Sequence, residues 1–292
     1  MSLNQFMQTL VNGLLLGCVY AAFALGLSLV LGILGLVNVA HSAILVLAAL
    51  VYWQLVNGVG IDPLLAIPLV IAAFFLAGTA LESTIVRRIE REPDTTALLV
   101  FFGTMVAIES IAVLVWTTDT RTVRPAYLDT VWRFGQVGVP VSRVVTAALT
   151  LLLLGGLHLF LTRTLTGAAI RGMAQNRDVA AMVGIRVRRL GIWVFAAGTA
   201  LAAFGGTVLA LVLPFSPQEH VRWLAWAFLI VIVGGLGSMR NTLLAGLLVG
   251  LLEAFVGVLL PFQYVYFVVY ALLVVALLAR REGLGGSQAR TI

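Results

Sequence analysis

The feature that most constrains this chain is a succession of long apolar runs, each close to the length of a membrane-spanning helix. A span needs about 20 apolar residues to cross the hydrocarbon layer. Because lipid offers no partner to backbone N–H and C=O groups, such runs must be helical. The sequence therefore predicts an all-α polytopic membrane protein with eight or nine spans in a single domain over residues 1–292. The runs are Leu10–Leu31, Val37–Val56, Pro63–Val86, Ala97–Trp116, Val141–Leu161, Leu190–Leu213, Trp223–Gly237, Leu243–Leu260 and Tyr264–Ala279.

Composition agrees with this class and excludes several functions. The 292 residues are 61% hydrophobic and only 10% charged, which is far too apolar for a soluble domain. The single cysteine, Cys18, permits no internal disulfide. The three histidines (His41, His158 and His220) are scattered without nearby Cys or Asp/Glu clusters, so we expect no metal site. The basic residues lie in loops between the runs and form no basic, aromatic-interleaved domain, so nucleic acid is not an expected partner.

Enzymatic chemistry and ATP hydrolysis are not expected of this chain. It has no Gly-x-x-x-x-Gly-Lys-Ser/Thr loop and no lysine to supply the phosphate-binding amine. We find no nucleophile paired with a base. The sequence therefore predicts a non-enzymatic membrane protein without a cofactor, and any ATP would be bound by a partner.

Charge predicts which loops face the cytoplasm. The longest polar segment between apolar runs, Thr162–Leu190, carries six arginines against one acid, Asp178. Cytoplasmic loops are enriched in basic residues. Placing this loop, Arg87–Asp94, Arg240 and the Arg280–Ile292 tail in the cytoplasm puts 13 of the 18 arginines inside and five outside. The N-terminus is then outside if all nine runs span, or inside if one early run is re-entrant.

The basic loop, residues 163–189, also contains the pattern of a short helix. Asn176 can cap it, Asp178 suits its first turn, and Gly184 can end it in a left-handed conformation. Between them, Ala180 and Ala181 have small side chains that would let another protein come close. The pattern alone allows either a docking segment or an ordinary basic loop.

The longest segment predicted to lie outside, residues 117–140, mixes charged residues with Tyr127, Trp132 and Phe134. Amphipathic residues of this kind suit the membrane interface. We expect a helix that lies in the interface, with a docking platform for an external partner as the alternative.

Two glycine-rich motifs interrupt the apolar pattern in similar ways. Gly32–Asn38 and Gly234–Asn241 each carry a Gly-x-Leu-Gly core followed by an asparagine, which suggests a weak internal repeat. Glycine disfavours helix, so these motifs predict either discontinuous helices whose free backbone groups line a cavity, or tight cytoplasmic turns. Small residues also recur every four positions at Gly13/Gly17/Ala21 and Gly246/Gly250/Ala254, a spacing that favours close helix packing.

Polar residues within the runs are the candidates for a solute path. Glu109 and Glu253 lie well inside their runs, where an ionisable group is costly. Each could contact a solute, bridge helices as a protonated group, or reach an arginine. His41 and Ser42 follow the first glycine motif and could face the same cavity. The candidate path comprises Asn38, His41, Ser42, Glu109, Gly235, Gly237, Ser238 and Glu253.

Three segments in order, Gly17–Leu50, Thr166–Val187 and Val231–Ala254, resemble the permease subunit of branched-chain amino-acid ABC transporters, the LivH type. The resemblance implies a bacterial inner-membrane protein that works with a second, LivM-like permease subunit, two cytoplasmic ATPase subunits and a periplasmic binding protein. It also implies that Ala169–Gly184 docks on an ATPase. The coupling residues would be Arg171, Asn176, Asp178, Ala180, Ala181 and Gly184.

The chain departs from the family pattern at Asn38–Ser42, which reads Asn-Val-Ala-His-Ser where the family usually has Asn-Phe-Ala-His-Gly. It also lacks the glycine that the family usually has near Asn241. The expected function is that of an ABC importer permease for a small polar solute, with branched-chain amino acids first. The alternatives are urea or short amides as cargo, or an ion-coupled secondary transporter.

Overall fold

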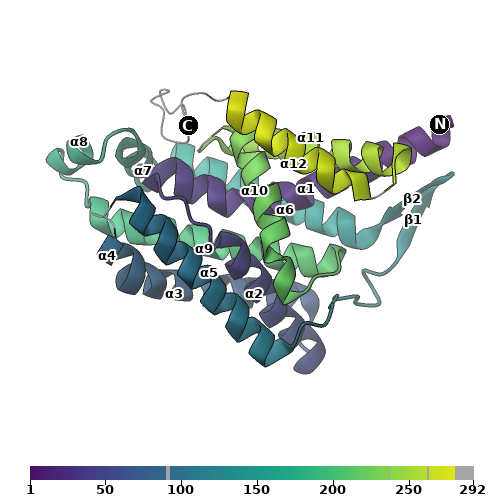
Figure 1. The fold of residues 1–292 in the computed structure, drawn as a ribbon, viewed down its shortest axis with the longest axis horizontal. Coiled ribbons are helices and arrows are strands. Elements are labelled where there is room, and N and C mark those ends of the chain that lie inside the picture. The colour runs from purple at the N-terminus through teal and green to yellow at the C-terminus, as the bar shows by residue number, and fades with distance from the viewer. Residues whose placement is uncertain (90–92, 236, 262, 280–292) are drawn as a thin grey trace.

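The computed structural model describes residues 1–89, 93–235, 237–261 and 263–279. This part of the chain is almost entirely helical, with one two-stranded hairpin (Figure 1). The elements are α1 (Leu3–Leu34), α2 (His41–Trp53), η1 (Gln54–Gly58), α3 (Pro63–Leu81), η2 (Glu82–Val86), α4 (Arg87–Ile89), α5 (Asp94–Trp116), β1 (Val131–Phe134), β2 (Val137–Pro140), α6 (Val141–Arg163), α7 (Leu165–Gln175), α8 (Arg177–Met182), α9 (Val187–Val212), η3 (Pro217–Glu219), α10 (His220–Gly234), α11 (Met239–Leu259) and α12 (Gln263–Ala279).

Each of the nine predicted apolar runs forms a helix. Within the described residues, seven helices are long and apolar enough to cross a membrane, and α10 and α12 are shorter. The first helix is longer than its predicted run, because Ser2 caps it with its side chain and Gln5 returns the contact to the Ser2 backbone. The second begins four residues later than predicted, at His41.

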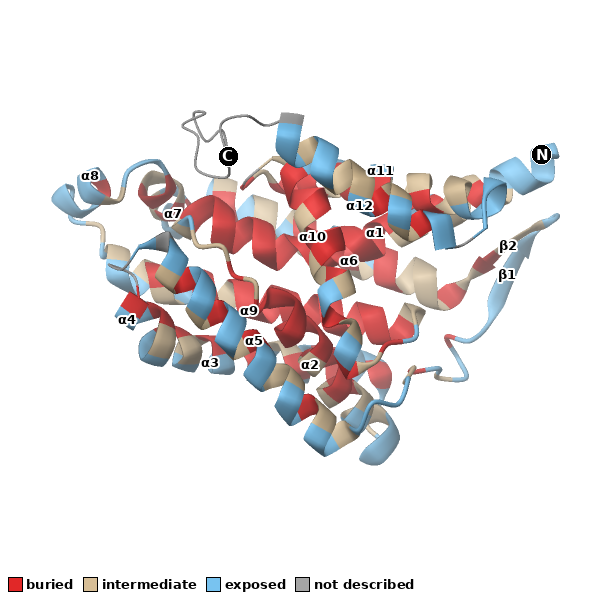
Figure 2. Ribbon diagram, viewed as in Figure 1, coloured by how far each residue is buried: buried red, intermediate tan, exposed pale blue. Residues whose placement is uncertain are grey.

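Helices α1 and α9 form the centre of the protein (Figure 2). In the most apolar 18-residue stretch of α9, 94% of the residues are buried, and in that of α1, 83% are buried. In the corresponding stretch of α5, only 17% are buried. α1 packs against α11, α9, α10 and α6, and α9 packs in addition against α2 and α3. The peripheral helices therefore keep apolar side chains on the surface, as expected of a protein surrounded by lipid.

The glycine stripes meet each other where α1 crosses α11. A Cβ on Gly17 would lie 2.5 Å from the Leu247 Cα, and one on Gly250 would lie 2.3 Å from the Gly17 backbone nitrogen. Only hydrogen fits between these backbones. The predicted role of the stripes in close helix packing is confirmed.

One end of the bundle carries the N-terminus together with the hairpin, and the opposite end carries α7 and α8 (Figure 1). The Gln8 side chain donates to the Gly138 carbonyl and accepts from its N–H, both at 2.8 Å. The start of α1 and residues 117–140 therefore lie on the same side of any membrane that the helices cross. The predicted cytoplasmic tail, residues 280–292, lies outside the described residues.

The predicted interface helix over residues 117–140 is wrong. This segment is irregular up to Thr130 and then forms the antiparallel hairpin of β1 and β2, with Phe134 paired to Val137. The two-residue turn contains Gly135 at φ 63°, a conformation that glycine adopts without strain. Tyr127 ties the irregular part to the start of α3 by donating to the Asp62 carboxylate at 3.0 Å, and burial together with this bond raises the pKa of Tyr127.

Candidate functional site

The two glycine motifs, far apart in the sequence, lie against each other. A Cβ on Gly237 would be 3.2 Å from the Gly32 Cα, so the connection between α10 and α11 packs on the last turn of α1. One helical turn deeper, the Thr242 hydroxyl donates to the Ser28 hydroxyl at 3.0 Å. α1 runs unbroken through Gly32 to Leu34, so the first break comes at Gly35 rather than inside the helix.

The connection between α1 and α2 turns back along α1. The His41 Nε2 lies 2.9 Å from the Phe23 carbonyl oxygen, about three turns before the end of α1. Residues 35–40 can extend at most about 20 Å, which is about the length needed to return that far. His41 thus anchors the start of α2 beside the interior of α1. It is 2% exposed, so it faces no open path in this conformation.

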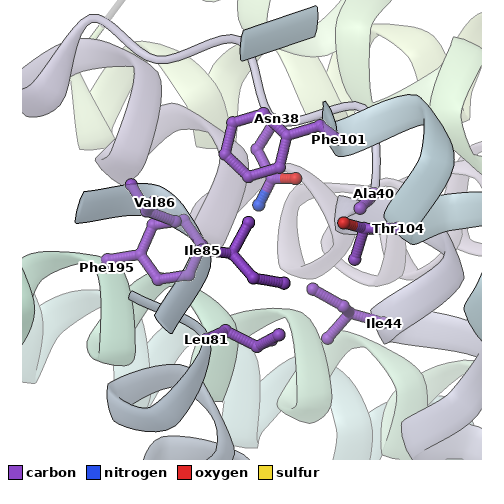
Figure 3. Close-up of a pocket in the computed structure, with 9 residues that line it drawn as sticks. All are labelled: Asn38, Ala40, Ile44, Leu81, Ile85, Val86, Phe101, Thr104 and Phe195. Atoms are coloured by element: carbon purple, nitrogen blue, oxygen red, sulfur yellow. The ribbon is translucent and has the colours of Figure 1, made fainter. Parts of the chain in front are cut away.

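Asn38, on the returning connection, points into a small pocket (Figure 3). The pocket measures about 10 Å³, roughly the space of one water molecule. Apart from Asn38 itself, Thr104 is the one polar side chain that lines it, and the others include Phe101 and Phe195. Among the described residues the Asn38 Oδ1 and the Ser42 hydroxyl have no hydrogen-bond partner. Asn38 and Ser42 are therefore buried, and a solute could reach them only after the surrounding helices rearrange.

The second glycine motif serves local structure. Gly235 and Gly237 have φ of 90° and 77°, and the Ser238 hydroxyl caps α11 by accepting from the Asn241 N–H. Positive φ strains most residues with a Cβ, asparagine and aspartate least. These residues form a tight connection between two helices, as the turn interpretation predicts, and pack against α1.

Gly237→Leu is expected to abolish transport while the protein still inserts in the membrane. Leucine would adopt a strained left-handed backbone and push against Gly32 of α1. Gly35→Asn is the matched control. Gly35 also has positive φ but is exposed at the end of α1, and asparagine tolerates that conformation. Solute uptake and membrane content measured for both variants test this. Normal uptake by Gly237→Leu would contradict it.

Glu253 is buried between three helices. Its Oε2 accepts hydrogen bonds from the Tyr20 hydroxyl of α1 at 2.7 Å and from the Trp226 indole of α10 at 3.0 Å. The same carboxyl group also lines a cavity of about 250 Å³ between α1, α6 and α11. Glu253 therefore bridges helices and borders open space at once.

Glu109 lies elsewhere, with a histidine as its partner. Its carboxylate is 3.8 Å from the Nε2 of His220, whose other ring nitrogen contacts the Pro217 carbonyl oxygen at 3.1 Å. Glu109 is 30% exposed on its side chain, whereas His220 is buried. The eight candidates for a solute path thus lie in separate places: beside α1 near Phe23, at the α10–α11 connection, at Glu253 and at Glu109.

The predicted coupling helix forms at the end opposite the hairpin. The Asn176 side chain accepts from the backbone N–H groups of Asp178 and Val179, both at 3.0 Å. Gly184 ends the turn at φ 85°, with its N–H bonded to the Ala181 carbonyl. The predicted cap and stop are therefore both present. Arg171 lies half-buried on the preceding helix α7.

The two alanines of α8 face opposite ways. Ala180 is 4% exposed and packs into a cluster with Ile170 and Met173 of α7, so it cannot meet another protein. Ala181 is exposed. The outer face of the segment also carries three exposed apolar side chains, which the sequence analysis did not single out: Val179, Met182 and Val183. We call Val179, Ala181, Met182 and Val183 the α8 face.

Residues 9–277 match the family model described as "Branched-chain amino acid transport system / permease component". The chain belongs to this permease family. Among its relatives, the high-affinity branched-chain amino acid transport system permease protein BraD of Pseudomonas aeruginosa is 28% identical over 96% of both chains. The permease protein LivH of Escherichia coli is 27% identical over 96% of both chains. No solved structure matches the chain.

The chain is also similar to a further high-affinity branched-chain amino acid transport system permease protein, LivM. LivM of Escherichia coli is 32% identical over 136 residues, which cover 44% of this chain and 32% of LivM. The multi-pass helical architecture that the sequence predicts is therefore that of a transport permease.

The sequence analysis of this permease missed Asn12 and Arg143, which line the cavity beside Glu253. In the sequence analysis, Arg143 is only one of the five arginines placed outside the cytoplasm. The available signal was a polar residue inside or at the start of an apolar run, the same signal that identified Glu109 and Glu253.

Proposed function

We propose that this permease is a membrane subunit of an ABC importer that moves branched-chain amino acids. The supporting observation is the family match over almost the whole chain, together with relatives whose names state that cargo. The chain itself carries out no covalent chemistry. Its helices provide a path that opens alternately to the two sides as separate ATPase subunits close and separate.

The proposed partners are a second, LivM-like permease subunit, two cytoplasmic ATPase subunits and a periplasmic solute-binding protein. Similarity to LivM supports a pair of related but different permease subunits. The α8 face supports a docking site for an ATPase, because exposed apolar side chains at a helix tip outside the bilayer mark a protein contact.

The proposed location is the bacterial inner membrane, with the C-terminus in the cytoplasm. The basic loop with α7 and α8 lies at one end, and the hairpin and the N-terminus lie at the other. Applying the positive-inside rule to the first end puts the N-terminus outside, so that all nine helical runs cross the membrane.

Leucine uptake should require ATP hydrolysis by the partner subunits and should survive an ionophore that dissipates ion gradients. The test is uptake of labelled leucine by vesicles that contain the whole transporter, with an ATPase-inactive variant of the partner as the control. Uptake that collapses with the ionophore and persists with the inactive ATPase would instead show a secondary transporter. Uptake of urea or short amides without leucine would contradict the cargo.

A further inference from the structure

The cavity beside Glu253 lies between α1, α6 and α11 and is lined by two groups of opposite charge. Its polar lining is Thr9 and Asn12 of α1, Arg143 of α6 and Glu253 of α11. We infer that this cavity binds the zwitterionic head of an amino acid, with Arg143 on the carboxylate and Glu253 on the ammonium group. The inference rests on the proposed function. It names the residues that would bind the solute and the way round in which the solute would lie.

The Glu253 carboxyl group is held by hydrogen bonds to one of its oxygens, and the other oxygen receives none of them. Among the described residues, both of its hydrogen bonds go to Oε2, from the Tyr20 hydroxyl and the Trp226 indole. These rings are themselves buried, at 1% and 0% exposed. The carboxyl group is therefore held rigidly by neighbours that need nothing from Oε1, and this oxygen is free to accept from an ammonium group in the cavity.

Arg143 has most of its donors left for a ligand. Its Nη1 lies 3.5 Å from the Asn12 Oδ1, which is the one side-chain hydrogen bond seen for this guanidinium in the described part of the chain. A guanidinium offers five N–H donors in a planar fork that matches the two oxygens of a carboxylate. Asn12 thus steers the guanidinium and leaves the rest of the fork to a ligand.

The rest of the cavity suits an aliphatic side chain. Its remaining lining residues are Leu16, Ala254, Gly257 and Val258, none of which offers a polar side-chain atom. A volume of about 250 Å³ is many times the roughly 10–15 Å³ that one water molecule needs, so the cavity admits a small solute. A lining that combines two opposite charges with apolar residues suits an apolar amino acid better than urea or a short amide.

The cavity opens at the surface beside the exposed Gly257 and Val258, and the position of the charges indicates what must cover that opening. Arg143 and Glu253 both belong to helices long and apolar enough to span the membrane. Ionisable groups in spans face the interior of a bundle, a partner or a water-filled path, because exposure to hydrocarbon is costly. The cavity lies toward the end that carries the N-terminus and the hairpin, since it is bordered by the N-terminal half of α1, the first turn of α6 and the last turns of α11. In the proposed orientation this is the side from which a binding protein delivers its solute.

The test is equilibrium binding of leucine to the complete transporter in nanodiscs without the binding protein, measured by calorimetry. Arg143→Gln and Glu253→Gln should each weaken leucine binding by roughly 10- to 100-fold, the usual range for losing one charged hydrogen-bonding partner. Arg133→Gln, on the exposed hairpin strand β1, is the matched charge control and should bind leucine like the wild type.

Two analogues of leucine separate recognition from damage to the fold. 3-Methylbutylamine lacks the carboxylate, so its affinity should fall in Glu253→Gln and stay unchanged in Arg143→Gln. 4-Methylpentanoate lacks the amine and should show the opposite pattern. A variant that merely misfolds would lose both analogues together. Equal losses of both, or leucine binding unchanged in both variants, would overturn the assignment.

Uptake by the same transporter reconstituted into sealed vesicles, with the binding protein and ATP supplied, distinguishes this inference from the proposed function. ATP-dependent leucine uptake without detectable leucine binding by the wild-type transporter would overturn the site and leave the function standing. Absence of uptake of every branched-chain amino acid would overturn the proposed function itself.

Discussion

Gly250→Ala is expected to prevent correct packing of α1 on α11 and to remove most of the folded protein. The added Cβ would lie 2.3 Å from the Gly17 nitrogen and 2.6 Å from the Gly13 carbonyl oxygen, and backbone atoms cannot rotate away. Overpacking a core usually costs about 1–3 kcal/mol, and moving two helices apart places this case at about 3 kcal/mol or more. The measurement is the yield and melting temperature of detergent-solubilised protein.

Gly155→Ala in α6 is the matched control for that substitution. A Cβ there meets nothing within 4 Å, so only the helix preference of alanine should remain. This preference favours alanine by about 0.5–1 kcal/mol. The two variants should therefore shift stability in opposite directions. A melting temperature for Gly250→Ala at or above that of the wild type would show that α1 and α11 do not approach as closely as the structure indicates.

Ala181→Trp is expected to uncouple the permease from its ATPase while leaving the permease folded. The residue is exposed on the α8 face, outside the spans, so a large side chain meets none of the permease's own core. At a docked interface it would separate surfaces that pack as tightly as a protein interior. We expect solute-stimulated ATP hydrolysis to fall by roughly tenfold or more, as for a central interface residue, and co-purification of the ATPase to weaken.

Two further variants serve as comparisons for Ala181→Trp. Arg188→Ala removes one exposed charge from a loop with several arginines, so its effect should be mild. Ala180→Trp should instead damage the permease, because Ala180 packs inward against α7. If Ala181→Trp retains its ATPase and Arg188→Ala does not, the arginine cluster rather than the α8 face holds the subunits together.

The helical elements were predictable to a large extent, and the errors have identifiable physical causes. Runs of apolar residues and the Asn176 cap are local patterns, and lipid leaves a long apolar run no alternative to helix. The hairpin at Val131–Pro140 was missed because aromatic and charged residues suit a strand as well as an interfacial helix. Gly135 was the decisive local signal, since a two-residue turn needs positive φ.

The sequence indicated which residues are candidates for the site, but not which of them lie together. Glu253 and Glu109 were recognised as unusual because a carboxylate in a span is costly wherever it lies. Their partners come from distant segments: Tyr20 and Trp226 for Glu253, and His220 for Glu109. The opposite orientations of Ala180 and Ala181 also depend on where α7 lies beneath α8.

The sequence by itself determined that this protein is a helical membrane permease, which apolar runs form its helices, and that its glycine stripes pack closely. Those properties depend on neighbouring residues and on the solvent, and both can be read along the chain. Only the tertiary structure decided that Arg143 and Glu253 border one cavity and that Gly237 rests on Gly32. Such pairs lie more than one hundred residues apart, and their meeting depends on how the helices pack together, which no local pattern encodes.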